Sequence, residues 1–161
     1  MNDSHSDALV FFGATGDLAY KKIFPALYAM QLRHQPAALV LSRQPLPTLD
    51  RKKYAPASGV ARGAYVLADP SRGNPEVILI ASGSEVGLAV EAHEKLVAEG
   101  IRSRVVSMAS WDIFEHQTQE YQDEVLPPDV TARVAVEQAS TFGWERYIGR
   151  SGRMVGVRVF S

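Results

Sequence analysis

The sequence predicts an α/β protein with a mostly parallel β-sheet flanked by helices. Two observations carry this prediction. Short continuous apolar runs, of which residues 76–81 (EVILIA) are the strongest, are typical of strands that are buried on both faces. Stretches with a helical spacing of apolar residues follow several of these runs. This alternation is typical of parallel sheets, and an antiparallel strand is possible near the sheet's ends.

The pattern of residues 1–43 predicts a strand, a turn, a helix and a second strand, in that order. Residues 8–12 (ALVFF) form an apolar run that ends at a glycine. Residues 18–31 carry apolar side chains at helical spacing, with Pro25 near the first turns. Residues 37–41 (AALVL) are a second apolar run. We therefore expect a short Rossmann-like βαβ start in this part of the chain.

Residues 44–63 have the composition of a linker. Prolines and glycines interrupt a polar stretch here, at Pro45, Pro47, Pro56, Gly59 and Gly63. The basic trio Arg51, Lys52 and Lys53 lies in the same stretch. These side chains could meet a phosphate, but we interpret them as part of a solvated loop.

Residues 64–161 predict one α/β domain. The expected strands cover residues 64–68, 76–81, 101–108, 133–137 and 154–160, with helices from Ser84 to just before Gly100 and over 111–125. Ser84 is suited to cap the first helix, and the prolines at 127 and 128 end the second. Four apolar residues are expected to line one face of the first helix: Leu88, Ala92, Leu96 and Val97.

Composition excludes several classes of function. Seventeen basic and 18 acidic residues give a net charge of −1, so we expect no general attraction to nucleic acid or to membranes. The chain has no cysteine, and therefore no disulfide or thiolate ligand. Its opening residues are polar and acidic, and no apolar run approaches the ~20 residues of a membrane helix. We expect a soluble, cytoplasmic chain of one domain with an appendage.

The glycine turn after the first strand is the clearest binding motif. Gly13 and Gly16 frame a turn that brings backbone N–H groups and a helix N-terminus towards an anion. The following strand delivers Arg43 to the edge where the ribose of a dinucleotide would lie, and an arginine can pair with the 2′-phosphate of NADP. Alternatively, the glycines only permit a tight turn.

Two segments near the N-terminus resemble the glucose-6-phosphate dehydrogenase family. They are residues 6–19 (SDALVFFGATGDLA) and 21–28 (KKIFPALY), and the likeness extends over about residues 1–34. It implies NADP contacts by Gly13, Thr15, Gly16, Asp17 and Leu18. The catalytic Asp-His-Tyr-Leu-Gly-Lys run of that family is absent from the sequence. The resemblance therefore implies nucleotide binding without a base for hydride transfer.

Most of the remaining chain resembles the transketolase family. Residues 38–50 (ALVLSRQPLPTLD), 75–86 (PEVILIASGSEV) and 142–147 (FGWERY) match in order, and the likeness covers about residues 36–161. It implies the end of the pyrimidine-binding domain, followed by a C-terminal α/β domain that stops before the family's final helix.

The transketolase resemblance also implies a role for Arg43. In that family the arginine of the SRQ segment helps to hold the sugar phosphate, although Pro45 replaces the usual asparagine nearby. Arg43 thus has three interpretations: a contact to NADP, a contact to a sugar phosphate, or a surface arginine. The family uses thiamine diphosphate and magnesium, bound by a Gly-Asp-Gly motif that this sequence lacks. We expect no metal site. His93 and His116 each stand beside a glutamate, Glu94 and Glu115, but adjacent residues of a helix point to different faces and cannot hold one ion together.

These resemblances lead to competing functional hypotheses. The first is a fusion whose transketolase-related part is not catalytic alone and at most offers a surface for a homodimer or for assembly with full-length transketolase. The second is a minimal NADP-binding module. The third is that neither half folds stably, because each lacks elements that cover its apolar faces.

Overall fold

A mixed five-stranded sheet forms the centre of the protein, in a computed structural model that describes residues 45–138 and 140–156. The strands are β1 (Ala64–Ala68), β2 (Val77–Ala81), β3 (Ser103–Met108), β4 (Arg133–Glu137) and β5 (Arg153–Gly156), in the order β1-β3-β2-β4-β5. β3, β2, β4 and β5 are parallel neighbours, whereas β1 pairs with β3 in the antiparallel sense. The prediction of a mostly parallel sheet with an antiparallel strand near one end is confirmed.

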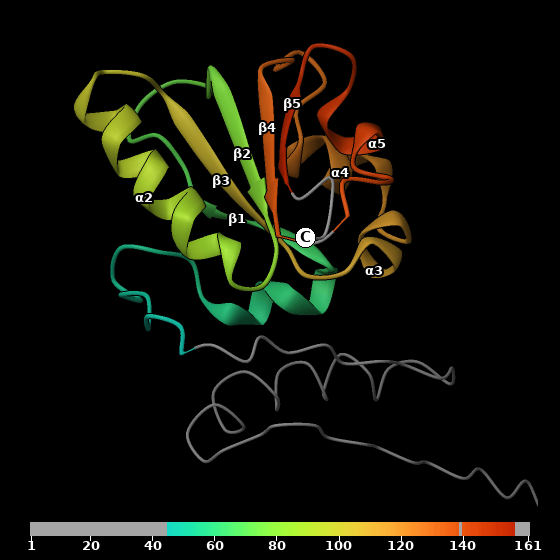
Figure 1. The fold of residues 1–161 in the computed structure, drawn as a ribbon, viewed down its shortest axis with the longest axis horizontal. Coiled ribbons are helices and arrows are strands. Elements are labelled where there is room, and N and C mark those ends of the chain that lie inside the picture. Colours follow the sequence, from blue (N-terminus) through green and yellow to red (C-terminus); the bar gives the residue numbers. More distant parts are fainter. Residues whose placement is uncertain (1–44, 139, 157–161) are drawn as a thin grey trace, which may run out of the picture.

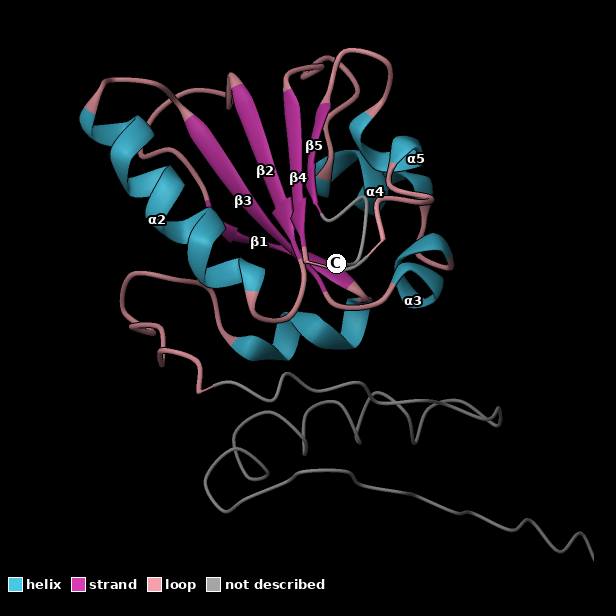
Figure 2. Ribbon diagram, in the orientation of Figure 1, coloured by secondary structure: helices cyan, strands magenta, loops and turns pink. Residues whose placement is uncertain are grey.

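Helices cover both faces of this sheet (Figures 1 and 2). They are the 3-10 helix η2 (Ala57–Arg62) and the α-helices α2 (Glu85–Ala98), α3 (Trp111–Glu115), α4 (Gln119–Val125) and α5 (Glu145–Ile148). α2 lies on one side of the sheet, and α3, α4 and α5 lie on the other (Figure 1). Within the described part of the chain, no helix is long and apolar enough to span a bilayer.

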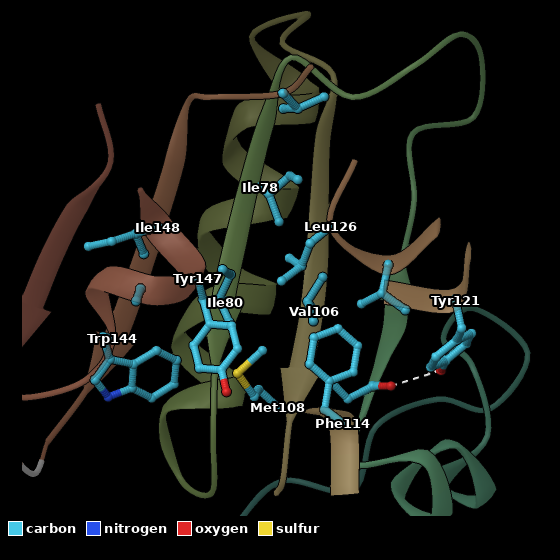
Figure 3. Close-up of a cluster of buried hydrophobic side chains, with 14 residues drawn as sticks. Ile78, Ile80, Val106, Met108, Phe114, Tyr121, Leu126, Trp144, Tyr147 and Ile148 are labelled. Atoms are coloured by element: carbon cyan, nitrogen blue, oxygen red, sulfur yellow. Dashed lines mark hydrogen bonds between the residues drawn. The ribbon is translucent and has the colours of Figure 1, made fainter. Parts of the chain in front are cut away.

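The central strand β2 contributes to two hydrophobic cores. Ile78 and Ile80 are fully buried in the core under α3, α4 and α5, which Figure 3 shows. Leu79 and Ala81 face the other core, under α2. Successive side chains of a strand point to opposite faces. A strand covered on both faces must therefore be continuously apolar, which explains why this segment was readily predicted.

The helix predicted over residues 111–125 is wrong as a single element. The chain forms two helices, α3 and α4, each with its own N-terminal cap. Ser110 Oγ accepts a hydrogen bond from Ile113 N at 3.3 Å, and Thr118 Oγ1 accepts one from Tyr121 N at 3.4 Å. The second cap starts a new helix axis. The break lets Phe114 and Tyr121 both reach the same core.

The predicted inner face of α2 is partly wrong. Leu88 and Val97 are 56% and 48% exposed, and the buried positions are instead Ala89, Val90 and His93, with Glu85. Leu88 lies about 100° from Ala89 around the helix, so the two cannot share a narrow buried stripe. Ser84 also does not cap α2 with its side chain: Ser84 Oγ donates to Glu85 Oε1 at 2.8 Å instead.

The segment expected to be a linker makes ordered contacts with the domain. Tyr54 is buried in the core under α2, and its hydroxyl donates to Glu94 Oε1. Lys53 also pairs with Glu94. Of the basic trio, Lys53 therefore neutralises a carboxylate of the same domain. The predicted βαβ start, and the end of the predicted last strand, lie outside the described residues.

Candidate functional site

The residues assigned to ligand binding from the sequence are not placed by the structure. They are Gly13, Thr15, Gly16, Asp17, Leu18 and Arg43, which all lie outside the described residues. The NADP turn and the phosphate-binding arginine therefore stay predictions.

A different site lies where β2 and β4 end. These strands are parallel neighbours, so their carboxyl ends meet at one edge of the sheet. The chain leaves β2 for α2 on one face of the sheet and leaves β4 for α5 on the opposite face (Figure 1). In open α/β sheets, ligands bind in the crevice at such a topological switch point.

Ser82 and Glu137 meet at this switch point. Ser82 directly follows β2, and Glu137 is the last residue of β4. Ser82 Oγ donates a hydrogen bond to Glu137 Oε2. The bond places one carboxylate between the ends of the two strands.

The surface above this pair is hollowed, with a volume of about 330 Å³. We call it the switch-point hollow, and its lining residues are Ser82, Met108, Ala109, Trp111, Glu137, Ser140 and Trp144. Trp111 and Trp144 meet edge to face, with ring centroids 5.1 Å apart and an interplanar angle of 89°. Within the described ranges, Glu137 is the only charged residue in the lining. The hollow thus combines an aromatic wall, one carboxylate and two serine hydroxyls.

Contacts between α3 and α5 hold the aromatic wall in place. Glu115 Oε1 accepts hydrogen bonds from Arg146 Nη1 at 2.5 Å and from the Tyr147 hydroxyl at 2.8 Å. The bonds from Arg146 and Tyr147 lower the pKa of Glu115. Burial, followed by the bond to Glu115, raises the pKa of Tyr147. Tyr147 also packs at 5.4 Å from Trp111, between ring centroids, so the cluster fixes the wall.

A second hollow, of about 290 Å³, lies between η2 and α4. The guanidinium of Arg62 stacks 3.2 Å from the ring centroid of Tyr121. The Tyr121 hydroxyl donates to Ala64 O at 2.8 Å, and burial raises its pKa. These contacts fix η2 to β1 and α4, and we interpret this hollow as a packing junction.

The polar groups in the described lining of the switch-point hollow are hydroxyls and one carboxylate. Its described lining holds no imidazole, amine or thiol that could serve as a base or nucleophile beside Ser82. The described residues also contain no group of three or more His, Cys, Asp or Glu side chains that could hold a metal ion. The sequence places Ser82 and Glu137 at the ends of predicted strands. It does not show that those strands are neighbours, so the site could not be assembled from the sequence.

Two family models match the chain. Residues 63–161 match the Transketolase-like TK C-terminal domain, and residues 10–51 match the glucose-6-phosphate dehydrogenase, NAD binding domain. The first match covers most of the chain, including the whole described sheet.

Curated relatives and solved structures agree with the first match. Transketolases of Halalkalibacterium halodurans and Geobacillus stearothermophilus are 54% and 50% identical over 132 residues, which is 82% of this chain and 20% of each relative. A transketolase of Pichia stipitis, solved with sedoheptulose 7-phosphate, superposes with a TM-score of 0.62 at 36% identity, over 73% of this chain and 16% of that one. Transketolase from Leishmania mexicana superposes with a TM-score of 0.58 at 39% identity, over 66% of this chain and 15% of that one.

The chain thus spans about a fifth of the length of the curated relatives it matches. The resemblance to transketolase stated from the sequence is confirmed, as is the α/β fold class that it implied. The chain belongs to the transketolase C-terminal domain family.

Proposed function

We propose that this chain acts as the C-terminal domain of a transketolase-type enzyme and is not catalytic by itself. The observation that carries the proposal is the family match over residues 63–161, in a sequence without the Gly-Asp-Gly motif for thiamine diphosphate. Ketol transfer depends on that cofactor, which stabilises the carbanion formed from the sugar. Residues 36–161 would contribute to this reaction of the pentose phosphate pathway by assembling with a partner chain.

The residues present do not fit thiamine diphosphate. The sequence lacks the Gly-Asp-Gly motif that holds the magnesium diphosphate in this family, and the described lining of the switch-point hollow has a single carboxylate and no cationic side chain for a diphosphate. We therefore derive no catalytic step through this cofactor. The proposed partner is a second copy of the chain or a full-length transketolase, in the cytoplasm. Light scattering of the chain, alone and mixed with the full-length enzyme, tests both possibilities.

An activity assay tests the proposed lack of catalysis. The purified chain is incubated with thiamine diphosphate, magnesium and a ketose–aldose pair of sugar phosphates, beside a full-length transketolase prepared in the same way. We expect no glycolaldehyde transfer from the chain, and turnover would overturn the proposal. Amide hydrogen exchange on the same sample distinguishes a folded domain from a loose ensemble.

NADP binding is the second candidate function, favoured by the match of residues 10–51 to the dehydrogenase family. The proposed contacts are the glycine turn from Gly13 to Leu18 and, for the 2′-phosphate, Arg43. Calorimetry should show NADP binding that is weaker in Gly16→Val. In Arg43→Ala, binding should be weaker for NADP but not for NAD. The absence of heat at millimolar NADP would remove this candidate.

We also propose that residues 1–34 and 36–161 descend from different proteins, joined near residue 35. This fusion predicts a continuous junction in the natural protein. Trypsin should release residues 34–43 (HQPAALVLSR) as one peptide that spans the junction. Mass spectrometry of the source organism tests this: peptides from either side of the junction without the spanning peptide would argue against the fusion.

A further inference from the structure

We propose that the hollow between η2 and α4, which we call the edge hollow, also binds a small N-acylated amino acid through its carboxylate and its amide. The inference goes beyond the proposed function, because it assigns a ligand site to this domain itself. The contacts of the packing junction fix the shape of the hollow but leave two sets of hydrogen-bonding groups unused. These are the guanidinium of Arg62 and the outward backbone groups of Val66, and both residues line the hollow.

Arg62 presents unused donors on a fixed surface. Its guanidinium lies 3.2 Å from the ring centroid of Tyr121. That ring is buried, and its hydroxyl donates to Ala64 O at 2.8 Å (Figure 3). Within residues 45–138 and 140–156, the Arg62 guanidinium makes no hydrogen bond or ion pair. A planar guanidinium stacked on a ring keeps its N–H groups at its rim, where they match the two oxygens of a carboxylate.

The backbone N–H and C=O groups of Val66 point away from the sheet. Gly63 O accepts a hydrogen bond at 2.8 Å from the residue that follows β3, so these two residues form a hydrogen-bonded pair. Hydrogen-bonded and non-hydrogen-bonded pairs alternate along antiparallel strands. Tyr65 therefore turns its N–H and C=O groups towards β3, whereas Ala64 and Val66 turn theirs outward. The bond from the Tyr121 hydroxyl to Ala64 O agrees with this alternation.

The edge hollow lies along this outer edge of β1. Tyr121 donates to Ala64 O, and Ala55 N donates to Leu67 O at 2.9 Å. Tyr121 and Ala55 both line the hollow, so it opens between these two bonds, beside Val66. Among the described residues, none forms a hydrogen bond with the outward groups of Val66. A free strand edge can pair with an added amide, and here the flanking bonds leave room for one residue only.

One N-acylated amino acid satisfies both sets of groups. In an antiparallel hydrogen-bonded pair, two residues exchange both of their N–H···O bonds. The amide N–H of the ligand donates to Val66 O, and its carboxylate accepts from Val66 N and from Arg62. The volume of about 290 Å³ is close to the lower end of the ~300–1,000 Å³ range of ligand pockets, which suits a ligand of this size.

The surrounding charges permit a carboxylate at Arg62. Arg51 Nη1 donates to Ala55 O at 2.9 Å, so a second cation lies beside the lining. Glu124 also lines the hollow, but it is exposed and forms no ion pair with Arg62. Because water and salt screen an exposed charge, Glu124 weakens the attraction of Arg62 for an anion without cancelling it.

Amide NMR can follow binding at the atoms concerned. We would titrate the full chain with N-acetylglycine, N-acetylglycinamide and 4-oxopentanoate. The glycinamide lacks the negative charge, and 4-oxopentanoate has a methylene group in place of the amide N–H. N-acetylglycine should shift the Val66 amide resonance, and it should bind about tenfold more tightly than the glycinamide and about threefold more tightly than 4-oxopentanoate. Equal affinity for N-acetylglycine and either analogue, or no saturable shift at Val66, would overturn the proposal.

A longer probe distinguishes a small molecule from the C-terminus of a peptide. N-acetyltriglycine should bind no more tightly than N-acetylglycine, because the bonds at Ala64 and Leu67 close the edge on both sides. Clearly tighter binding would show that the edge accepts an extended peptide and that the proposed ligand class is wrong.

Charge-removing variants assign the preference to one residue. Arg62→Gln should weaken the binding of N-acetylglycine about tenfold and leave N-acetylglycinamide unchanged. Arg72→Gln, at an exposed position outside the hollow, should change neither, and Glu124→Gln should not weaken either probe. If Arg62→Gln binds N-acetylglycine as the unmodified chain does, the site assignment is wrong. If this variant does not fold, the ranking of the probes and the Val66 shift in the unmodified chain still decide the proposal. None of these measurements depends on ketol transfer.

Discussion

Arg104 holds Asp69 with two parallel hydrogen bonds. Nε donates to Oδ1 and Nη2 donates to Oδ2, both at 2.8 Å. Nη1 of the same guanidinium donates to the carbonyl oxygens of Glu124 and Val125 at the end of α4. Because Arg104 lies in β3 and Asp69 directly follows β1, one buried side chain joins two strands and a helix end.

Replacing this arginine should destabilise the domain strongly. Arg104→Met should lower the free energy of unfolding by about 2–4 kcal/mol, because Asp69 and the carbonyl groups lose their partners. Asp69→Asn should cost about 1 kcal/mol, since this carboxylate is 46% exposed and partly screened. Urea unfolding measures both losses. Arg72→Met, at an exposed position, should stay within about 0.5 kcal/mol. A similar loss for Arg72→Met and Arg104→Met would show that the buried network has no special role.

The exposed side of α2 should tolerate truncation. Leu88→Ala should change stability by less than about 0.5 kcal/mol, because Leu88 is 56% exposed. Val90→Ala should cost about 2 kcal/mol, because Val90 is buried against the sheet and its truncation leaves a cavity. Thermal or urea unfolding of both variants decides between the observed face and the one predicted from the sequence. A larger loss for Leu88→Ala would favour the predicted face.

The strands could be predicted closely because burial on both faces leaves a continuous apolar run in the sequence. β1 and β4 have the predicted bounds, whereas β3 begins at Ser103, two residues after the predicted start. The buried face of α2 was harder to predict, because apolar residues lie on more than one face of this helix. Which of them are buried depends on how the helix packs against the sheet. α5 has only four residues, too few to produce a helical period.

The candidate site depends on strand order, which the sequence does not contain. Ser82 and Glu137 are 55 residues apart, and they meet only because β2 lies between β3 and β4. Apolar runs show that a strand is central, but not which strands are its neighbours. Trp144 reaches the hollow from the N-cap position of α5, a helix that the sequence did not predict.

Acid should destabilise the domain partly through His93. This side chain is buried, and its Nδ1 lies 2.7 Å from Ser103 Oγ. Burial, with a smaller contribution from Lys53, lowers the pKa of His93 below its ordinary 6.5. The unfolded chain therefore binds the proton first, so stability is lost as the pH falls from about 6.5 towards the lowered native pKa. Above this window, His93 should contribute no pH dependence.

The pH dependence can be assigned by substitution. Unfolding free energies at pH 7.5 and 5.0 should differ less in His93→Gln than in the unmodified chain. His116→Gln should keep most of the difference, because His116 is exposed. An unchanged difference in His93→Gln would show that other groups cause the loss in acid.

Gly63 should not tolerate a side chain. Its φ of 83° is a conformation that favours glycine, and a Cβ atom there would lie 2.3 Å from Phe114 N and 2.6 Å from Ser110 O. Its carbonyl accepts hydrogen bonds from the N–H groups of Ala109 and Ser110, at 2.8 and 2.9 Å. Gly63 thus fixes the start of β1 against the start of α3, and neither segment can move without breaking these bonds.

Comparison with a second glycine separates contact from backbone strain. Gly100 has a φ of 81°, but a Cβ atom there would meet nothing within 4 Å. Gly100→Ala should therefore cost about 1 kcal/mol, from strain alone. Gly63→Ala should cost more than about 2 kcal/mol, because the overlap with backbone atoms adds to the same strain. Urea unfolding of the two variants measures the difference, and equal losses would mean that the start of α3 can move away from β1 at little cost.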